Sequence, residues 1–166
     1  MIHYRKAQND EMPELKALLW KHGPNEWNYL PEQGVNETFS LMEKGTAAAL
    51  IAVHANKIVG LSLLTDGSSS PSYLEKYCDL KSICFVAEVV VAKKFSGKGI
   101  AANLLKMCIK EAEKKGCTKV LIERHEENLA SAGMMRKAGF KIIDTCKAPD
   151  KRLSGSQNNV VLQIEI

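Results

Sequence analysis

Hydrophobic and polar residues follow two repeating patterns along this chain, which together predict an ordered series of strands and helices. Short apolar runs rich in branched side chains predict strands at residues 2–6, 46–54, 58–64, 83–92, 119–123, 140–146 and 159–166. Apolar positions spaced three or four residues apart predict helices at about 10–20, 36–44, 100–115 and 128–138. The predicted order is therefore strand, two helices, three strands, helix, strand, helix and two strands.

Glycine and proline residues mark several of the predicted boundaries. Pro13 lies in the first turn of the first helix, where a missing N–H is tolerated, and Gly45 and Gly139 follow the second and fourth helices. Residues 55–57 predict the turn of an antiparallel hairpin, and residues 66–72 are expected to form a flexible loop. The strand, helix and strand that follow predict a crossover that pairs two strands in parallel.

A glycine-containing turn joins the most apolar strand to the longest helix. The valines at 89–91 predict a strand buried on both faces, and Gly97 and Gly99 precede the helix. The first N–H groups of a helix have no intrahelical partner, so small residues here would let an anion such as phosphate approach the backbone. A tight turn without a ligand fits two glycines equally well. The dinucleotide-binding pattern Gly-x-Gly-x-x-Gly is incomplete, because Ala102 stands at the position of its third glycine. The Gly-Lys-Ser/Thr of a phosphate-binding P-loop is also missing.

Two sequence blocks resemble motifs of the GNAT N-acetyltransferase family. The residues Ser96-Gly97-Lys98-Gly99-Ile100-Ala101 resemble the family's acyl-coenzyme A signature Gln/Arg-x-x-Gly-x-Gly/Ala, with serine in its first position. A second block resembles the family's Asn-x-x-Ala-x-x-x-Tyr-x-Lys-x-Gly-Phe segment, with matches at Asn128, Lys137, Gly139 and Phe140. Both blocks stand in the family's order and at its separation, and the resemblance is clear over residues 83–145.

The resemblance implies an α/β (α+β) fold, the acyl-CoA N-acyltransferase fold, in which four helices flank a mixed central sheet of about seven strands that is splayed between the fourth and fifth strands. In this family the thioester lies in that opening, and its pantetheine amides pair with the central strand. By position, the resemblance assigns this strand edge to Val89, Val90 and Val91, and a pantetheine contact to Asn128. It assigns the pyrophosphate cradle to Ser96, Gly97, Lys98, Gly99, Ile100, Ala101 and Ala102.

The activity implied by the resemblance is transfer of an acetyl group from acetyl-CoA to a primary amine of a small molecule or peptide, by direct attack in a ternary complex. An ammonium ion cannot attack a thioester, so the reaction needs a group that accepts a proton. The candidate catalytic residues are Glu88, which interrupts an apolar strand, and Glu123, which ends the next strand. The alternatives are an ion pair at the strand edge for Glu88 and a structural carboxylate for Glu123. For the neighbouring His125, an exposed loop position is the favoured interpretation.

The group that would protonate the departing thiolate is not assigned. Many family members carry a tyrosine seven residues after the conserved asparagine, and Met135 stands there in this sequence. Tyr73, Tyr77 and Cys84 lie near the central strand in sequence, and nothing selects among them; water could also serve, because a thiolate is a tolerable leaving group. Met135 is also consistent with a non-catalytic or weakly active acyl-CoA-binding module of the same fold. A third hypothesis, from an unrelated class of protein, is a nucleotide or phosphate binder.

The sequence does not identify the amine acceptor, although the family's acceptor pocket corresponds to residues 20–39 and 147–159. Trp27, Tyr29, Lys151 and Arg152 are candidate pocket residues by position. The two adjacent basic residues indicate either a solvated loop, which is the favoured interpretation, or an acceptor that carries a carboxylate or a phosphate.

Composition narrows the remaining possibilities. The chain has 166 residues, of which 45% are hydrophobic and 25% charged, as expected for a single domain over 1–166. It has no apolar stretch of membrane-spanning length and no signal-peptide pattern, so we expect a cytoplasmic protein without a membrane partner. The net charge of +4 is spread along the chain, which argues against a nucleic-acid partner. Five cysteines without Cys-x-x-Cys spacing predict buried free thiols and no metal site. For the oligomeric state, we expect either a monomer or a homodimer.

Overall fold

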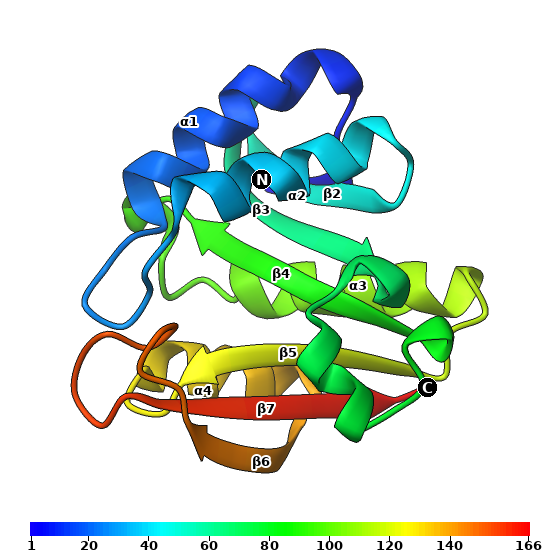
Figure 1. Cartoon of the computed structure of the whole chain (residues 1–166). Coiled ribbons are helices and arrows are strands. Elements are labelled where there is room, and N and C mark those ends of the chain that lie inside the picture. The colour runs from blue at the N-terminus through cyan, green and yellow to red at the C-terminus, as the bar shows by residue number, and fades with distance from the viewer.

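One mixed sheet of seven strands runs through the computed structural model, which describes residues 1–166 (Figure 1). The strands lie in the order β1-β2-β3-β4-β5-β7-β6, and only β4 and β5 pair in parallel. Their bounds are β1 His3–Lys6, β2 Ala47–His54, β3 Lys57–Asp66, β4 Ile83–Val91, β5 Lys119–His125, β6 Lys141–Lys147 and β7 Asn158–Glu165. The predicted fold class is confirmed.

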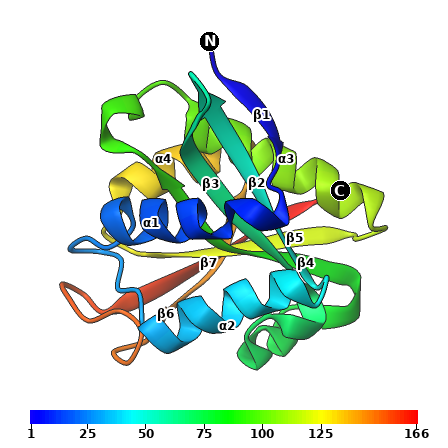
Figure 2. The same cartoon turned by 90° about the horizontal axis from the view of Figure 1, so that it is seen from above.

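Four α-helices cover the sheet: α1 Met12–His22, α2 Glu32–Glu43, α3 Ile100–Lys114 and α4 Leu129–Ala138. Leu15 of α1 and Phe39 of α2 belong to a hydrophobic cluster with residues of β2, β3 and β4. Leu105 of α3 and Met135 of α4 belong to a second cluster, which includes residues of β4, β5 and β7. The two helix pairs therefore cover opposite faces of the sheet (Figure 2). None of these helices is both long enough and apolar enough to cross a membrane.

Two segments differ from the expected elements. Helix α2 begins at Glu32, about one turn before the predicted start at Asn36, because Pro31 ends an extended segment and occupies the N-cap position. Residues 66–72, expected to be a flexible loop, contain a 3-10 helix at Gly67–Ser69 that leads towards another at Ser72–Lys76. A Cβ atom added to Gly67 would lie 1.9 Å from the carbonyl oxygen of Leu80, so this segment is closely packed.

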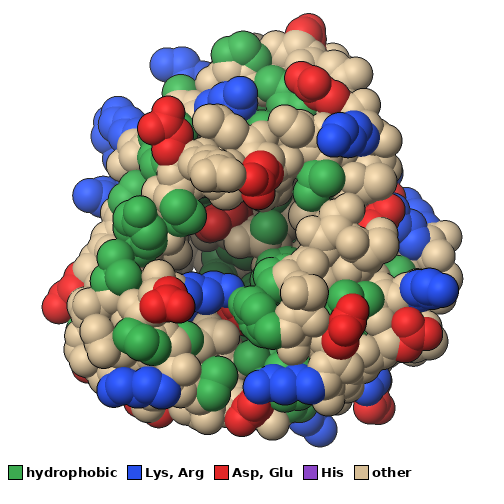
Figure 3. Space-filling model, in the orientation of Figure 1, with side chains coloured by type: hydrophobic (Ala, Val, Ile, Leu, Met, Phe, Trp, Pro, Cys, Tyr) green, Lys and Arg blue, Asp and Glu red, His purple; other side chains and the backbone are tan.

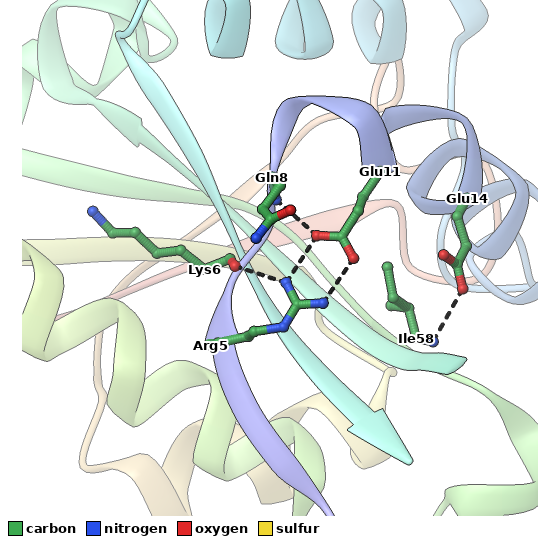
Figure 4. Close-up of polar contacts among 6 residues, drawn as sticks. All are labelled: Arg5, Lys6, Gln8, Glu11, Glu14 and Ile58. Carbon is green, nitrogen blue, oxygen red and sulfur yellow. Dashed lines mark hydrogen bonds and ion pairs between the residues drawn. The ribbon is translucent and has the colours of Figure 1, made fainter. Parts of the chain in front are cut away.

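Polar contacts fix the N-terminal strand and helix (Figure 4). The guanidinium of Arg5 donates two hydrogen bonds of 2.8 Å to the carboxylate of Glu11, which also accepts one of 2.7 Å from the backbone N–H of Gln8. The hydrogen bonding of Arg5, followed by that of the Gln8 backbone, lowers the pKa of Glu11 to about 2. The side chain of Glu14 accepts a 3.1 Å hydrogen bond from the backbone N–H of Ile58, which ties α1 to β3.

The parallel strands β4 and β5 separate towards their C-terminal ends. Their pairing begins at Ile83 and Lys119 and ends at Val86 and Ile122, although both strands continue further. Figure 1 shows the two ribbons diverging beyond this point. Strand β4 stays paired with β3 up to Val91, and β5 stays paired with β7, so an opening forms inside the sheet. The predicted splay between the fourth and fifth strands is confirmed, and it determines where the candidate site lies.

Candidate active site

A cavity of about 600 Å³ occupies the opening between β4 and β5. Its wall is formed by the diverging ends of both strands, the start of α4, the loop between α1 and α2, and the loop between β6 and β7. Figure 3 shows a hollow in the middle of this face, with acidic, basic and hydrophobic side chains around it. The cavity wall includes several residues that the sequence singled out: Trp27, Tyr29, Glu88, Val89, Val90, Val91, Glu123, Asn128, Lys151 and Arg152.

A β-bulge directs Glu88 to the face of the sheet that α1 and α2 cover. Consecutive residues of β3 pair with Val86 and Glu88, so Ala87 has no partner in β3. Val86 packs in the cluster of α3 and α4, whereas Val90 packs in the cluster of α1 and α2. Residues an even number apart share a face in a regular strand, so the extra residue at the bulge reverses the face between them. Glu88 lies two residues before Val90 and shares its face.

The carboxylate of Glu88 has no ion-pair or hydrogen-bond partner in the protein, so the ion pair considered from the sequence is not formed. Although Glu88 lines the cavity, the surrounding protein desolvates its carboxyl group and raises its pKa to about 7, while the charges of Arg152 and Lys151 act in the opposite direction. A carboxyl group with this pKa is partly ionised at neutral pH, and it can both accept and release a proton.

The second carboxylate, Glu123 in β5, is held by two neighbouring side chains. Its Oε2 forms an ion pair with Nζ of Lys151 and accepts a 2.8 Å hydrogen bond from the hydroxyl of Tyr73. Only 3% of the Glu123 side chain is exposed, and its Oε1 is buried without a partner. Desolvation, followed by the charge of Glu123, raises the pKa of Tyr73. These contacts connect β5 to the Tyr73 segment and to the loop that carries Lys151.

The favoured interpretation of residues 151–152 as a solvated loop is wrong for Arg152, whereas the side chain of Lys151 is 37% exposed. Backbone N–H groups of Lys151 and Arg152 both donate to the carbonyl of Ala148, which forms a tight turn. Arg152 is only 7% exposed, and its Nε donates a 3.0 Å hydrogen bond to Oδ1 of the buried Asn159 in β7. Burial lowers the pKa of Arg152. The turn therefore places a guanidinium group in the cavity wall, beside the lysine that binds Glu123.

His125 ends β5 and is 1% exposed, so the expectation of an exposed loop position is wrong. Its Nδ1 accepts a 2.9 Å hydrogen bond from the backbone N–H of Glu127, which places the ring proton on Nε2, 2.7 Å from the carbonyl oxygen of Ser154. The ring also packs against Trp27, with 4.8 Å between ring centroids. His125 thus connects the two loops that carry Trp27 and Ser154, and both loops contribute to the cavity wall.

The predicted cofactor turn follows β4 and lies beside the cavity rather than in its wall. Gly97 and Gly99 have φ angles of +77° and +78°, in the left-handed region that favours glycine, and the space that a Cβ would enter is open at both. Ser96, which stands at the departing motif position, donates a 2.8 Å hydrogen bond from its hydroxyl to the carbonyl of Lys93. The turn therefore exposes its backbone, while the serine side chain supports the turn itself.

The start of α3 presents unpaired backbone donors next to this turn. The first hydrogen bond of the helix runs from the N–H of Asn103 to the carbonyl of Gly99, so the N–H groups of residues 100–102 have no acceptor within the helix. Free N–H groups at the positive end of a helix dipole attract anions. Together with the open side of the glycine turn, they offer backbone N–H donors to an anionic group.

Asn128 forms the N-cap of α4. Its Oδ1 accepts a 3.1 Å hydrogen bond from the backbone N–H of Ser131, while its Nδ2 donates to no group of the protein. Because Asn128 also lines the cavity, the same side chain can cap the helix and offer an N–H donor to a ligand.

None of the acid candidates from the sequence lines the cavity. The hydroxyl of Tyr73 donates to Glu123, that of Tyr77 donates to Asp144, and Cys84 is buried. Met135 does line the cavity, but it is part of the hydrophobic cluster and has no proton to donate. The cavity wall thus contains a candidate base, Glu88, but none of the three side chains considered from the sequence as the proton donor for the thiolate.

Comparison with known sequences identifies the family. Residues 12–140 match the model of the Acetyltransferase (GNAT) family, and the chain belongs to this family, as its motifs predicted. A curated relative, "GCN5-related N-acetyltransferase 6, chloroplastic" from Arabidopsis thaliana, is 33% identical over 63 residues. This match covers 38% of the chain and 22% of the relative, so the chain aligns with about a fifth of that protein's length.

Solved structures share the fold over nearly the whole chain. An N-acetyltransferase from Staphylococcus aureus Mu50 has a TM-score of 0.78 at 16% identity, covering 99% of this chain and 98% of that one. A GNAT family acetyltransferase from Elizabethkingia anophelis, solved with acetyl-CoA bound, has a TM-score of 0.73 at 20% identity, with the same coverage. Because both sequence identities are low, the comparison with these structures shows a shared fold only.

Proposed function

We propose that this protein is an acetyl-CoA-dependent N-acetyltransferase that acetylates a primary amine of a small molecule or peptide by direct attack in a ternary complex. Family membership supports the reaction type, and the acetyl-CoA bound to the Elizabethkingia neighbour supports the donor. The observation that carries the proposal is Glu88, an unpaired carboxylate with a pKa of about 7 in the wall of the opening between the splayed strands.

The donor would lie along the free edge of β4. Beyond Val86 this strand has no partner on its β5 side, so backbone groups among Val89, Val90 and Val91 are available to pair with the pantetheine amides. The Nδ2 of Asn128 would donate to the same arm. The pyrophosphate would be held by the glycine turn and the start of α3, formed by Ser96, Gly97, Lys98, Gly99, Ile100, Ala101 and Ala102.

In the proposed reaction the carboxylate of Glu88 accepts a proton from the ammonium group of the acceptor, directly or through one water molecule. The neutral amine then attacks the thioester carbonyl, a C–N bond forms, the C–S bond breaks, and the nitrogen releases its second proton to water. The thiolate takes its proton from water in this proposal, because none of the three acid candidates lines the cavity. Glu123 acts as a positioning residue, since it holds Lys151 and Tyr73.

The test is thiol release from acetyl-CoA with amino acids, polyamines, aminoglycosides and peptide N-termini as acceptors. One thiol released for each amine consumed is the expected result. We expect Glu88→Gln to lower kcat by about 100-fold or more, and the matched variant Glu123→Gln to lower it by less than about tenfold. Firm binding of acetyl-CoA without thiol release for any amine would contradict the proposal and favour a non-catalytic acyl-CoA-binding module.

A further inference from the structure

Arg152 brings a positive charge without an ion-pair partner into the cavity wall. The residue is 93% buried, since 7% of it is exposed, and its one hydrogen bond to the protein runs from Nε to the neutral Oδ1 of Asn159. Neither Nη nitrogen has an acceptor in the protein, and no carboxylate lies within ion-pair distance. Burying a cation without a partner is unfavourable, so the arrangement indicates an anion that binds from the cavity.

The other cations of the wall have more partners in the protein. Lys151 forms an ion pair with Glu123, and Nη1 of Arg124 donates to two backbone carbonyls, although its Nε is buried without an acceptor. Desolvation lowers the pKa of His22, and its Nδ1 accepts a 3.3 Å hydrogen bond from the backbone N–H of Lys93. Asp150 is exposed to solvent. Among the cations of the wall, Arg152 is the one that is more than nine-tenths buried and makes a single hydrogen bond to the protein.

Glu88 and Arg152 together form a pattern that matches a zwitterion. Both side chains belong to the same cavity wall, and the charge of Arg152 acts on the carboxyl group of Glu88 although the two form no ion pair. An ammonium group beside Glu88 and a negative group at Arg152 would complement both. One guanidinium balances one negative charge, which favours a carboxylate over a phosphate carrying about two charges at neutral pH.

We propose that the acceptor is a small amine of the amino-acid class, whose carboxylate is bound by the Nη nitrogens of Arg152 while its amino group faces Glu88. This inference rests on the proposed acetyltransferase function and names its acceptor. A planar guanidinium binds a carboxylate through two parallel N–H donors. Asn159 is 2% exposed and holds Nε, so it fixes the orientation of this group as a positioning residue.

The kinetic test compares amino acids with their carboxamides, which keep the amine and lose the charge, and with their phosphonate analogues. We expect kcat/KM for the acids, expressed per ammonium form of each substrate, to exceed that for the carboxamides by about tenfold or more. In Arg152→Gln this ratio is expected to fall to within about twofold. The matched variant Lys141→Gln removes one exposed positive charge outside the cavity and is expected to keep the ratio. Equal use of acids and carboxamides, or preference for phosphonates, would overturn the inference.

A binding measurement separates this inference from the proposed function and does not depend on a folded variant. Calorimetry with the wild-type protein and coenzyme A is expected to show N-acetyl amino acids binding about tenfold or more tightly than N-acetyl amino-acid amides. Selective binding of the acids without turnover of any amine would support the anion site and contradict the acetyltransferase function. Turnover of amines with no selectivity for a carboxylate in either assay would leave the function standing and overturn the anion site.

Discussion

Lys151 forms an ion pair with Glu123, and this pair distinguishes the two carboxylates of the cavity. Glu123 is held between Lys151 and Tyr73, with only 3% of its side chain exposed. Glu88, on the facing strand, has no partner and a pKa of about 7. Two residues that looked equivalent in the sequence therefore occupy different environments, one suited to holding a loop and the other to accepting a proton.

Replacing Lys151 by methionine removes the partner of a buried carboxylate. We expect Lys151→Met to lower the free energy of unfolding by about 1–2 kcal/mol, less than for a fully buried pair because the lysine is 37% exposed. Adding Glu123→Gln to this variant is expected to restore part of the loss, since no charge is then left unpaired. Urea denaturation at pH 7.5 measures both effects. An unchanged midpoint for Lys151→Met would show that the ion pair does not hold this loop.

The glycine turn gives a prediction with a matched control. Gly99→Ala and Gly45→Ala both place a side chain at a left-handed position with open space around it, with φ of +78° and +81°. Each is expected to cost about 1 kcal/mol of stability. Only Gly99→Ala is expected to raise the KM for acetyl-CoA, by about fivefold or more, because its Cβ enters the space assigned to the pyrophosphate. Equal KM values for both variants would remove the turn from the donor site.

Asn128 is expected to show separable structural and binding roles. Asn128→Ala removes the N-cap hydrogen bond to the backbone of Ser131 and should lower the free energy of unfolding by about 1 kcal/mol. Asn128→Ser keeps a capping oxygen but lacks the amide donor, so stability should recover while acetyl-CoA binding stays weakened. Denaturant unfolding and calorimetric titration with acetyl-CoA report the two quantities. Full recovery of binding in the serine variant would contradict the assigned donor contact.

The raised pKa of Glu88 predicts a pH-dependent cost to stability. Its folded-state pKa of about 7 lies above the ordinary value of 4.5, so its stabilising contribution is complete below pH 4.5 and is lost as the pH rises through 7. The stability of Glu88→Gln relative to wild type is therefore expected to increase by up to about 3 kcal/mol between pH 5 and pH 8. Denaturant unfolding across this range measures the difference. A difference that does not vary with pH would mean that the carboxyl group is not desolvated.

The sequence predicted the order of elements, the parallel pair, the splay and the family, because these follow from local periodicity and from short contiguous motifs. The bulge at Ala87 has no such signal, yet it decides which face Glu88 occupies. The expectations for His125 and Arg152 were wrong because their burial depends on partners distant in sequence, such as Ser154 and Trp27 for the histidine. A single domain over 1–166 and a cytoplasmic location stay predictions.

The most direct test of the account is the pH dependence of kcat/KM for one amine acceptor with wild type and Glu88→Gln. For wild type we expect the rate to fall as the pH drops below an apparent pKa of about 7, where the carboxyl group of Glu88 becomes protonated. An acceptor whose amine has a pKa well above 7 keeps its own ionisation in a separate, higher range of pH. In Glu88→Gln the limb near pH 7 is expected to disappear and the plateau to fall by about 100-fold. The same limb and the same plateau in both proteins would contradict a catalytic role for Glu88.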